Sequence, residues 1–296
     1  MKVSVIIPTY GRSDFLHKAV HSVLEQSYSE IELIIVDDNG AGTPNQRSNE
    51  QFIKDLNSAM VSYIPLPQNR GGSHARNVGA FHSSGDFICF LDDDDEFLPE
   101  KISKQVELLS KRSDFVACYT NHIRINHVTN KRYATNSRMQ GDLRKALLLF
   151  QVDLCGGSTL MVRRTAFNEL EGFVENLKRN QDYEFVTRLS HLGPIGVVEE
   201  PLTIINTHRG SNRLHKFSEV ENNRLRYINV VEFVIRSLSE EDQKLVFDNN
   251  YMFLLIEAIK LHSLRGVLKY FSKCGFSIDI IKKLMKKTTN YIKKRL

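Results

Sequence analysis

The chain has 296 residues, of which 41% are hydrophobic and 25% are charged, values that exclude disordered, collagen-like and coiled-coil proteins. The length fits one large domain or two small ones. The formal net charge of +5 is unevenly distributed: residues 260–296 hold 11 Lys/Arg and one acid, Asp279 (net +10), whereas residues 1–259 hold 29 Lys/Arg and 34 Asp/Glu (net −5). An acidic body argues against nucleic-acid binding, and only the basic end suits an anionic surface.

The cysteines and the apolar runs indicate where the protein works. The chain has four cysteines, Cys89, Cys118, Cys155 and Cys274. They form no CxxC pair, which excludes a zinc knuckle and gives no sign of a disulfide framework, so we expect reduced thiols. No apolar run reaches the roughly 18 residues of a membrane span. The apolar run 3–7 ends at Pro8 and is too short for a signal peptide, which predicts a cytoplasmic protein.

Short apolar runs alternate with helical patterns through the first 112 residues. Strands are predicted at 3–7, 33–36, 61–64 and 87–91, and helices at 13–24, 45–58, 73–83 and 101–110. Ser13 is expected to cap the first helix and Pro99 to open the last one. This alternation indicates βαβ units and a mainly parallel sheet. Functional residues of such sheets lie at the carboxyl ends of the strands, here 8–10, 37–38 and 92–95.

The second half of the chain is mixed at first and then helical. Strands are predicted near 115–125 and 158–162 and a helix around 181–191, and from about residue 217 the pattern is nearly all helical. The segment 278–296 repeats apolar residues with lysines between them, as a basic amphipathic helix does. Such a helix either packs on the body with its lysines in water or binds an anionic membrane, where each Lys or Arg contributes about 1 kcal/mol.

Four consecutive aspartates, Asp92–Asp95, follow the strand predicted at 87–91. An acidic run is commonly a solvated loop, but this run is held between a buried strand and a helix. Adjacent carboxylates raise each other's pKa unless a cation neutralises them. Hard carboxylate oxygens suit Mg²⁺ or Mn²⁺, which leave positions open for phosphate oxygens. The run therefore predicts a divalent metal ion that binds a diphosphate.

Five segments occur in a distinctive order: VSVIIPTYGR, LEQSY, ELIIVDDN, NRGGSHARNVGA and GDFICFLDDDDEFLP. Together they resemble family 2 glycosyltransferases of the bacterial surface-polysaccharide type. The resemblance implies the α/β GT-A fold, which is Rossmann-like with a mixed, mainly parallel sheet, and an inverting, nucleotide-sugar-dependent reaction. It covers roughly 1–215 as the catalytic domain, with a nucleotide-sugar half (1–112) and an acceptor half (113–215). A helical region, 216–296, follows.

The resemblance assigns a set of positions to the nucleotide sugar. They are Pro8, Thr9, Tyr10, Arg12, Asp38, Arg70, Arg76, Asp92 and Asp93. Tyr10 would offer its ring to the base, and Asp38 would accept a hydrogen bond from the uracil N3–H. Arg76, with Arg70 as a second candidate, would pair with the diphosphate. The structural alternatives are a turn residue for Asp38 and surface arginines for the other two.

Asp92 and Asp94 match the D-x-D motif of the family, whose first aspartate contacts the ribose side of the donor and whose second holds Mn²⁺ or Mg²⁺. Because Asp93 and Asp95 are also acidic, the register stays open: Asp92 is expected to bind the metal together with Asp94, and Asp93 is a further metal candidate. The segment NTHRGS resembles a loop that closes over the donor phosphates. His208 within it would contact the metal or the diphosphate, unless it is a structural histidine.

The second half supplies the acceptor side and the base. Gly156, Gly157 and Ser158 resemble the small-residue segment near the acceptor, with an ordinary tight turn as the alternative. The segment RNQDYEF matches the family's E-D motif and places Asp182 where the general base is expected. Gln181 stands where glutamate is usual. The alternative role for Asp182 is a helix N-cap.

These assignments predict transfer of a hexose from UDP-glucose or UDP-galactose to a sugar hydroxyl, with formation of a β-linkage. The acceptor would be an oligosaccharide or a polyprenyl-diphosphate-linked sugar of O-antigen or polysaccharide synthesis. The basic C-terminal helix would hold the enzyme on the inner, cytoplasmic face of the membrane.

Three other interpretations compete with transfer. A sugar-phosphate nucleotidyltransferase would need a Gly-rich, basic loop after the first strand, where PTYGR has one glycine. A binding module for nucleotide sugars or glycans would release no UDP. Polynucleotide binding would rest on the tail alone, which lacks interleaved aromatic residues apart from Tyr291.

Overall fold

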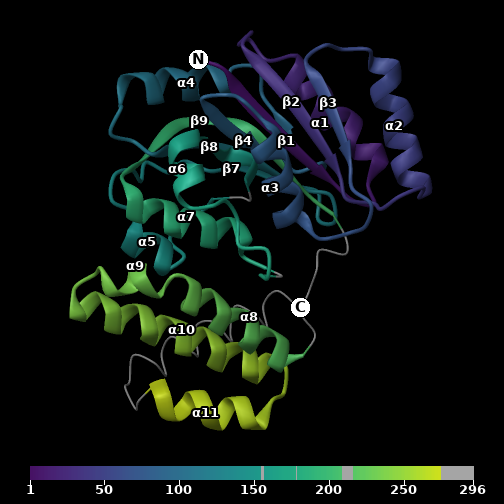
Figure 1. Ribbon diagram of the computed structural model, residues 1–296. Helices are drawn as coiled ribbons and strands as arrows, with labels where there is room; N and C mark the ends of the chain where they lie inside the picture. Colours follow the sequence, from purple (N-terminus) through teal and green to yellow (C-terminus); the bar gives the residue numbers. More distant parts are fainter. Residues whose placement is uncertain (155–156, 178, 209–215, 275–296) are drawn as a thin grey trace. The chain divides into compact units, whose positions relative to one another are not determined.

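The computed structural model describes residues 1–296 except 155–156, 178, 209–215 and 275–296 (Figure 1). The chain divides into two compact units, Met1–Ser211 and Asn212–Leu296. The predicted domain limits at residues 112 and 215 stay predictions. The predicted helix at 278–296 lies outside the described residues.

A mixed sheet forms the centre of the first unit. Its strands are β1 (Val3–Thr9), β2 (Ile31–Asp37), β3 (Val61–Pro65), β4 (Phe87–Phe90), β5 (Glu96–Phe97), β6 (Ala117–Asn126), β7 (Lys131–Ala134), β8 (Leu160–Arg163) and β9 (Ile195–Thr207). Within the described residues their order is β3-β2-β1-β4-β8-β6-β9-β5, with β7 paired to β6. Strands β1–β4 are parallel neighbours, β6 and β9 are parallel, and β8 runs antiparallel between β4 and β6. The predicted α/β class with a mixed, mainly parallel sheet is confirmed.

Helices cover both faces of this sheet (Figure 1). They are α1 (Ser13–Leu24), α2 (Pro44–Leu56), α3 (Gly72–His82), α4 (Lys101–Lys111), α5 (Arg144–Leu148), α6 (Arg164–Glu169) and α7 (Gln181–Leu192). The predicted starts at residues 13 and 101 are confirmed, but the two predicted capping roles were wrong. Helix α1 begins at Ser13 itself, with Arg12 as its N-cap residue, and α4 begins at Lys101 behind Glu100, so that Pro99 lies outside it.

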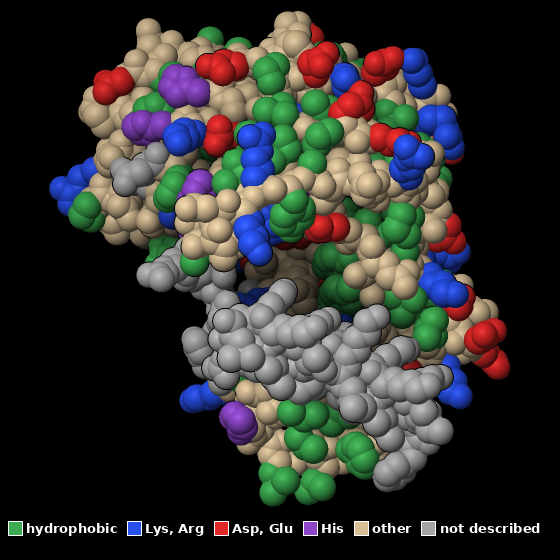
Figure 2. All heavy atoms as spheres, turned by 180° about the vertical axis from the view of Figure 1, so that it is seen from behind, with side chains coloured by type: hydrophobic (Ala, Val, Ile, Leu, Met, Phe, Trp, Pro, Cys, Tyr) green, Lys and Arg blue, Asp and Glu red, His purple; other side chains and the backbone are tan. Residues whose placement is uncertain are grey.

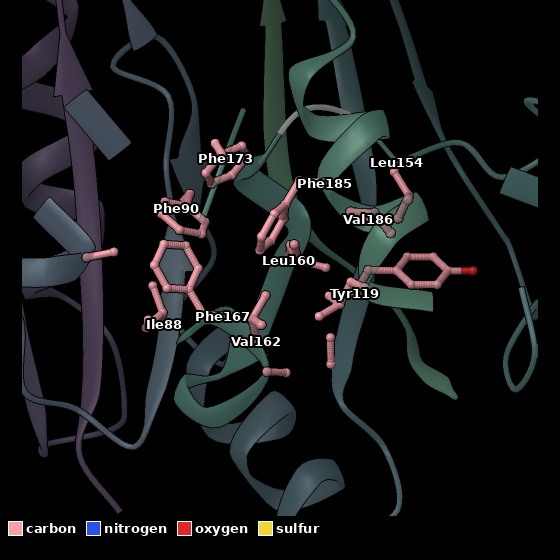
Figure 3. Packing of buried hydrophobic residues seen from close by; sticks show 14 of the residues in the cluster. Ile88, Phe90, Tyr119, Leu154, Leu160, Val162, Phe167, Phe173, Phe185 and Val186 are labelled. Atoms are coloured by element: carbon pink, nitrogen blue, oxygen red, sulfur yellow. The ribbon is translucent and has the colours of Figure 1, made fainter. Parts of the chain in front are cut away.

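Two buried clusters join the helices to the sheet because successive strand residues point to opposite faces. Val5 of β1 packs with α1 and α4, whereas Ile6 packs with α3, α6 and α7. The second face is rich in aromatic rings (Figure 3). Phe173 meets Phe90 edge to face with centroids 5.0 Å apart, and it stacks on Phe185 of α7 at 4.3 Å. Such pairs fix α7 against the carboxyl-terminal half of β4.

A carboxylate network around Glu32 of β2 joins the amino-terminal ends of β1 and β2 to the segment before β4. Its oxygens accept hydrogen bonds from the Ser4 hydroxyl (2.6 Å) and the Ser84 amide (2.6 Å), and Lys2 Nζ lies 2.6 Å away. Burial alone would raise the pKa of Glu32, but the bonds from Lys2, Ser4 and Ser84 lower it to about 2.

We expect Glu32→Gln to reduce the free energy of unfolding by about 1–2 kcal/mol at pH 7, because the lowered pKa stabilises the folded state wherever the carboxylate is ionised. The loss should be complete above pH 4.5, the ordinary pKa of the side chain, and should vanish as the pH falls towards about 2. Urea denaturation across this range measures it. The exposed Glu30→Gln is the matched control. An equal effect at every pH would contradict the assigned cause.

The second unit is helical. It contains α8 (Phe217–Val230), α9 (Glu232–Arg236), α10 (Glu240–Lys260) and α11 (Leu264–Cys274). Its core gathers Phe217 of α8, Leu254 and Leu255 of α10, and Tyr270 of α11. No helix in the described parts of the chain combines the length and the apolar character that a membrane crossing requires.

Candidate active site

The acidic turn Asp92–Asp95 follows β4 and divides into two pairs of side chains. Asp93 and Asp95 are buried, whereas Asp92 and Asp94 are half-buried. The alternation leaves the carboxylates of Asp92 and Asp94 available to a ligand. This arrangement favours Asp92 and Asp94 as the two aspartates of the D-x-D motif. Asp93 is buried instead, so its carboxylate is less accessible to a metal ion.

Asp93 joins the turn to the end of β1. Its Oδ2 accepts hydrogen bonds from the Thr9 hydroxyl (2.9 Å) and the Tyr10 amide (3.2 Å), and Arg12 Nη1 lies 3.4 Å from Oδ1. Burial raises the pKa of Asp93 to about 6, although Arg12 and Thr9 act against that rise. Pro8 and Thr9 are buried in β1, and the Tyr10 side chain is 59% exposed. Tyr10 thus presents a free ring beside the acidic turn.

Asp95 joins the same turn to segments that lie far away in the chain. Its carboxylate accepts hydrogen bonds from the Ser158 hydroxyl (2.6 Å) and the Asn206 amide (3.0 Å), and the Asn206 side chain donates to the Asp94 carbonyl (2.8 Å). Burial, and secondarily Asp92, raise the pKa of Asp95. The sequence prediction missed Asp95 and Asn206 as anchors. The only sequence signal for Asn206 is that it opens the segment NTHRGS, two positions before His208.

The two half-buried aspartates each meet an arginine. Arg76 of α3 is buried and bonds Asp92, and the exposed Arg12 bonds Asp94. Burial alone would lower the pKa of Arg76, but Asp92 raises it, so the guanidinium stays charged. Charge-assisted pairs of this kind are the strong ones in proteins. Two cations therefore already lie where a diphosphate would approach the acidic turn.

Asp38 and Arg70 take part in a different set of contacts. Asp38 is buried, and its two oxygens accept hydrogen bonds from the amides of Arg70 (2.8 Å) and Gly71 (2.7 Å). Gly71 has φ +90°, a conformation that favours glycine, and it precedes α3. The Arg70 side chain is exposed and lies 3.5 Å from Glu175. Asp38 thus orients the start of the helix that carries Arg76, and its contact with uracil stays a prediction.

Asp182 lies in the first turn of α7, close enough to Arg76 and Asp92 to interact electrostatically with both. The N-cap residue is Asn180, so the alternative role of Asp182 as the cap is wrong. Its Oδ1 is buried and has no hydrogen-bond partner within the described residues. Burial raises the pKa of Asp182 and Arg76 lowers it. An unpartnered carboxylate oxygen facing this charged site is free to accept a proton.

His208 follows β9 and lies close enough to Asp94 of the acidic turn to interact with it electrostatically. Its ring stacks on His127 with centroids 4.7 Å apart and contacts Phe15 at 4.5 Å. His127 is itself bonded to Asn206 at 2.8 Å. The buried Nε2 of His208 has no hydrogen-bond partner among the residues that the structure describes. The sequence prediction also missed His127, which lies 81 positions from His208 and meets it only through the pairing of β6 with β9.

These side chains fit a divalent cation. Asp94 offers hard oxygens, and His208, which interacts electrostatically with Asp94, offers an orphaned imidazole nitrogen. Across the described ranges, no group of three or more His, Cys, Asp or Glu side chains is arranged to hold a metal. A cation here would therefore need ligand oxygens or water to complete its shell, as Mg²⁺ commonly does.

The predicted acceptor segment is only partly described, because Gly156 lies outside the described residues. Gly157 is buried, and a Cβ there would come within 3.0 Å of the Phe90 Cβ and 3.7 Å of the Arg76 Nε. Ser158 is fully buried. Its hydroxyl donates to Asp95 and accepts from the Asp92 amide at 3.1 Å. Its observed contacts hold the acidic turn, and acceptor contact stays a prediction for this segment.

We expect Ser158→Ala to lower the free energy of unfolding by about 1–3 kcal/mol, because it leaves an Asp95 oxygen and the Asp92 amide buried without that partner. Urea denaturation measures the loss. Ser73→Ala is the matched control, since the Ser73 hydroxyl is buried without a hydrogen-bond partner in the described parts of the chain. Equal midpoints for the two variants would show that the Ser158 contacts contribute nothing.

The chain is similar to known glycosyltransferases. The model of the glycosyl transferase family 2 matches residues 4–171. An uncharacterized glycosyltransferase of Haemophilus influenzae is 26% identical over 286 residues, which is 95% of this chain and 90% of the relative. The putative teichuronic acid biosynthesis glycosyltransferase TuaG of Bacillus subtilis is 37% identical over 111 residues, 38% of this chain and 43% of the relative.

A solved structure has the same fold. The crystal structure of S. aureus TarS 1–349 in complex with UDP-GlcNAc superposes with a TM-score of 0.72 at 18% identity. The match covers 92% of this chain and 79% of that one.

Proposed function

Because the chain belongs to glycosyl transferase family 2, as its motifs predicted, we propose that it moves a hexose from UDP-glucose or UDP-galactose to a sugar hydroxyl, forming a β-glycosidic bond. The acceptor is a polyprenyl-diphosphate-linked sugar in the synthesis of a bacterial surface polysaccharide such as O-antigen. The family membership makes the chain a glycosyltransferase, and the similarity to a relative named for teichuronic acid synthesis supports the acceptor class. One observation carries the reaction: the paired carboxylates Asp92 and Asp94 lie with Arg76, Arg12 and Asp182 around one site.

The donor binds along the carboxyl ends of β1, β2 and β4. The exposed ring of Tyr10 stacks on the base, and Asp38 accepts the uracil N3–H while it keeps its two backbone bonds. Asp92 faces the ribose side. Arg76 pairs with the diphosphate, and the exposed Arg70 adds a second cation at the rim of the site.

Asp94 and His208, together with Asp92, would hold Mn²⁺ or Mg²⁺. When bound, the cation neutralises negative charge on the departing diphosphate. The guanidinium of Arg76 also stabilises the negative charge of the diphosphate. The hydrogen bonds of Asp93 and Asp95 hold the acidic turn in position.

Asp182 acts as the general base. Its unpartnered oxygen accepts the proton of the attacking hydroxyl, and Arg76 lowers the pKa of the carboxylate against the larger effect of burial. The hydroxyl attacks the anomeric carbon from the face opposite the leaving UDP. A single displacement of this kind inverts the configuration, so an α-linked donor yields a β-linkage.

The C-terminal residues bring the enzyme to its acceptor. Residues 260–296 carry a net charge of +10, which suits the anionic cytoplasmic face of a membrane. A lipid-linked acceptor is embedded in that surface, so reversible binding there raises the local acceptor concentration.

The test is a panel of UDP-sugars incubated with Mn²⁺ and scored for UDP release, with and without a synthetic lipid-diphosphate sugar. We expect release from one hexose donor to rise strongly when the acceptor is added, and the product to contain a β-linkage by NMR. A binding module would retain UDP-sugars without acceptor-dependent release, and that outcome would overturn the proposal.

A further inference from the structure

Helix α11 exposes an apolar stripe. Leu264, Leu268 and Phe271 are spaced by four and three residues, so they lie on one face of the helix. Their side chains are 74%, 65% and 42% exposed. Hydrophobic side chains gather at the lower end of Figure 2, where Figure 1 draws α11. Three large neighbouring apolar side chains in water indicate an interaction surface.

The stripe is not the face that packs on the helical core. Tyr270 and Gly266 are buried against α8 and α10, and Gly266 has no room for a side chain beside Phe217. Leu264 and Leu268 point to a different side of the same helix. The core that the described helices α8, α10 and α11 share is therefore formed without the stripe.

Basic side chains flank the stripe. Arg265, Lys269 and Lys273 are all exposed and fall on the adjoining arc of the helix, where Lys269 Nζ pairs with Glu221 of α8 at 2.7 Å. The 22 residues that follow α11 contain seven more Lys/Arg and a single acid, Asp279. An apolar face with Lys and Arg beside it is the composition of helices that lie in the interface of an anionic membrane.

The charge around the stripe favours a lipid surface over a second copy of the chain as its binding partner. Two copies meeting through this stripe would bring two sets of basic side chains together, and like charges repel. An anionic bilayer instead offers an apolar interior for the stripe and negative headgroups for its flanking cations.

We propose that α11 inserts Leu264, Leu268 and Phe271 into the interface of an anionic membrane, with Arg265 and Lys273 on the headgroups. The inference deepens, and rests on, the proposed membrane association. It divides that association into an apolar contact made by α11 and an electrostatic one made by the residues after it. Two such signals are what stable peripheral binding requires.

The first experiment is sedimentation of the full-length protein with vesicles of phosphatidylcholine, alone or mixed with phosphatidylglycerol. We expect wild type to bind the mixed vesicles. The triple variant Leu264→Gln/Leu268→Gln/Phe271→Gln should bind them about tenfold or more weakly, because it loses three apolar contacts. The matched control is Leu225→Gln/Leu245→Gln/Ile259→Gln, three apolar residues of α8 and α10 that are 41–43% exposed, which should bind like wild type.

The second experiment uses the absence of tryptophan from the chain. Leu268→Trp introduces one fluorophore on the stripe, and Leu245→Trp introduces one on α10. On addition of mixed vesicles we expect a blue shift, and quenching by brominated lipid, for Leu268→Trp alone. This readout reports insertion even if the triple variant folds poorly.

Several results would overturn the inference. They are wild-type binding by the triple variant, equal loss in both triple variants, no response of Leu268→Trp, and a wild-type dimer that the stripe variant converts to monomer. Failure of the wild type to bind any vesicle would remove the proposed membrane association as well. UDP release from a UDP-sugar in solution is measured in parallel, so failure of the transferase proposal is seen separately.

Discussion

Replacing Asp182 by asparagine is expected to lower the rate of sugar transfer by about 10²–10⁴-fold, the usual contribution of a general base, because an amide accepts no proton. UDP binding should be nearly unchanged, since asparagine has the same shape and the pair between Arg76 and Asp92 remains. Rates of UDP release measure the first effect, and calorimetric titration of UDP with Mn²⁺ measures the second.

The pH dependence adds an independent test of Asp182. A base works only when ionised, so the wild-type rate should fall as the pH drops through the pKa of Asp182. Burial raises that pKa, which places the fall above the ordinary range of an aspartate. Asp114→Asn is the control, because Asp114 is exposed and pairs only with the nearby Arg112 at 2.8 Å in the contacts described. Lost UDP binding in Asp182→Asn, with the control intact, would refute the base assignment.

Local sequence patterns were sufficient to predict the first half of the fold. The strand predicted at 33–36 lies within β2, and the helices predicted at 13–24 and 73–83 agree with α1 and α3 within one residue. Apolar runs there are bounded by turn residues such as Gly71, so each element is visible in its own residues.

Strand β9 was not predicted, because its 13 residues do not look like one strand. The exposed Glu199 and Glu200 and then Pro201 interrupt it, and its pairing with β6 shifts register there. Its last residues, Asn206 and Thr207, are polar. Long pairing with β6 overrides these local preferences, and only tertiary structure contains that information.

The sequence likewise predicted the position of the acidic turn, but not which of its four aspartates are buried. Alternation alone does not say which aspartates face inwards. Asp93 is buried by Thr9, Asp95 by Ser158 and Asn206, and these partners lie 84, 63 and 111 positions away. The site residues that could be predicted are those at strand ends, whereas their anchors depend on contacts between distant segments.

Asp94→Ala is expected to affect both chemistry and binding, unlike the change at Asp182. Transfer should fall by about 10²–10³-fold, the usual cost of losing one group that stabilises developing charge. UDP should bind about tenfold or more weakly in the presence of Mn²⁺, because Asp94 and His208 would hold a cation whose positive charge attracts the diphosphate. Calorimetric titration of UDP measures the affinity, with and without Mn²⁺.

The decisive quantity is the increase in UDP affinity that Mn²⁺ produces. It should be large in wild type and lost in Asp94→Ala, and the two proteins should bind UDP alike once a chelator removes the metal. Glu96→Gln is the matched control, since Glu96 is a half-buried acid two residues further along, in β5. If Mn²⁺ strengthens UDP binding equally in wild type and in Asp94→Ala, Asp94 is not a metal ligand. The half-buried pair Asp92 and Asp94 would then act only through its arginines.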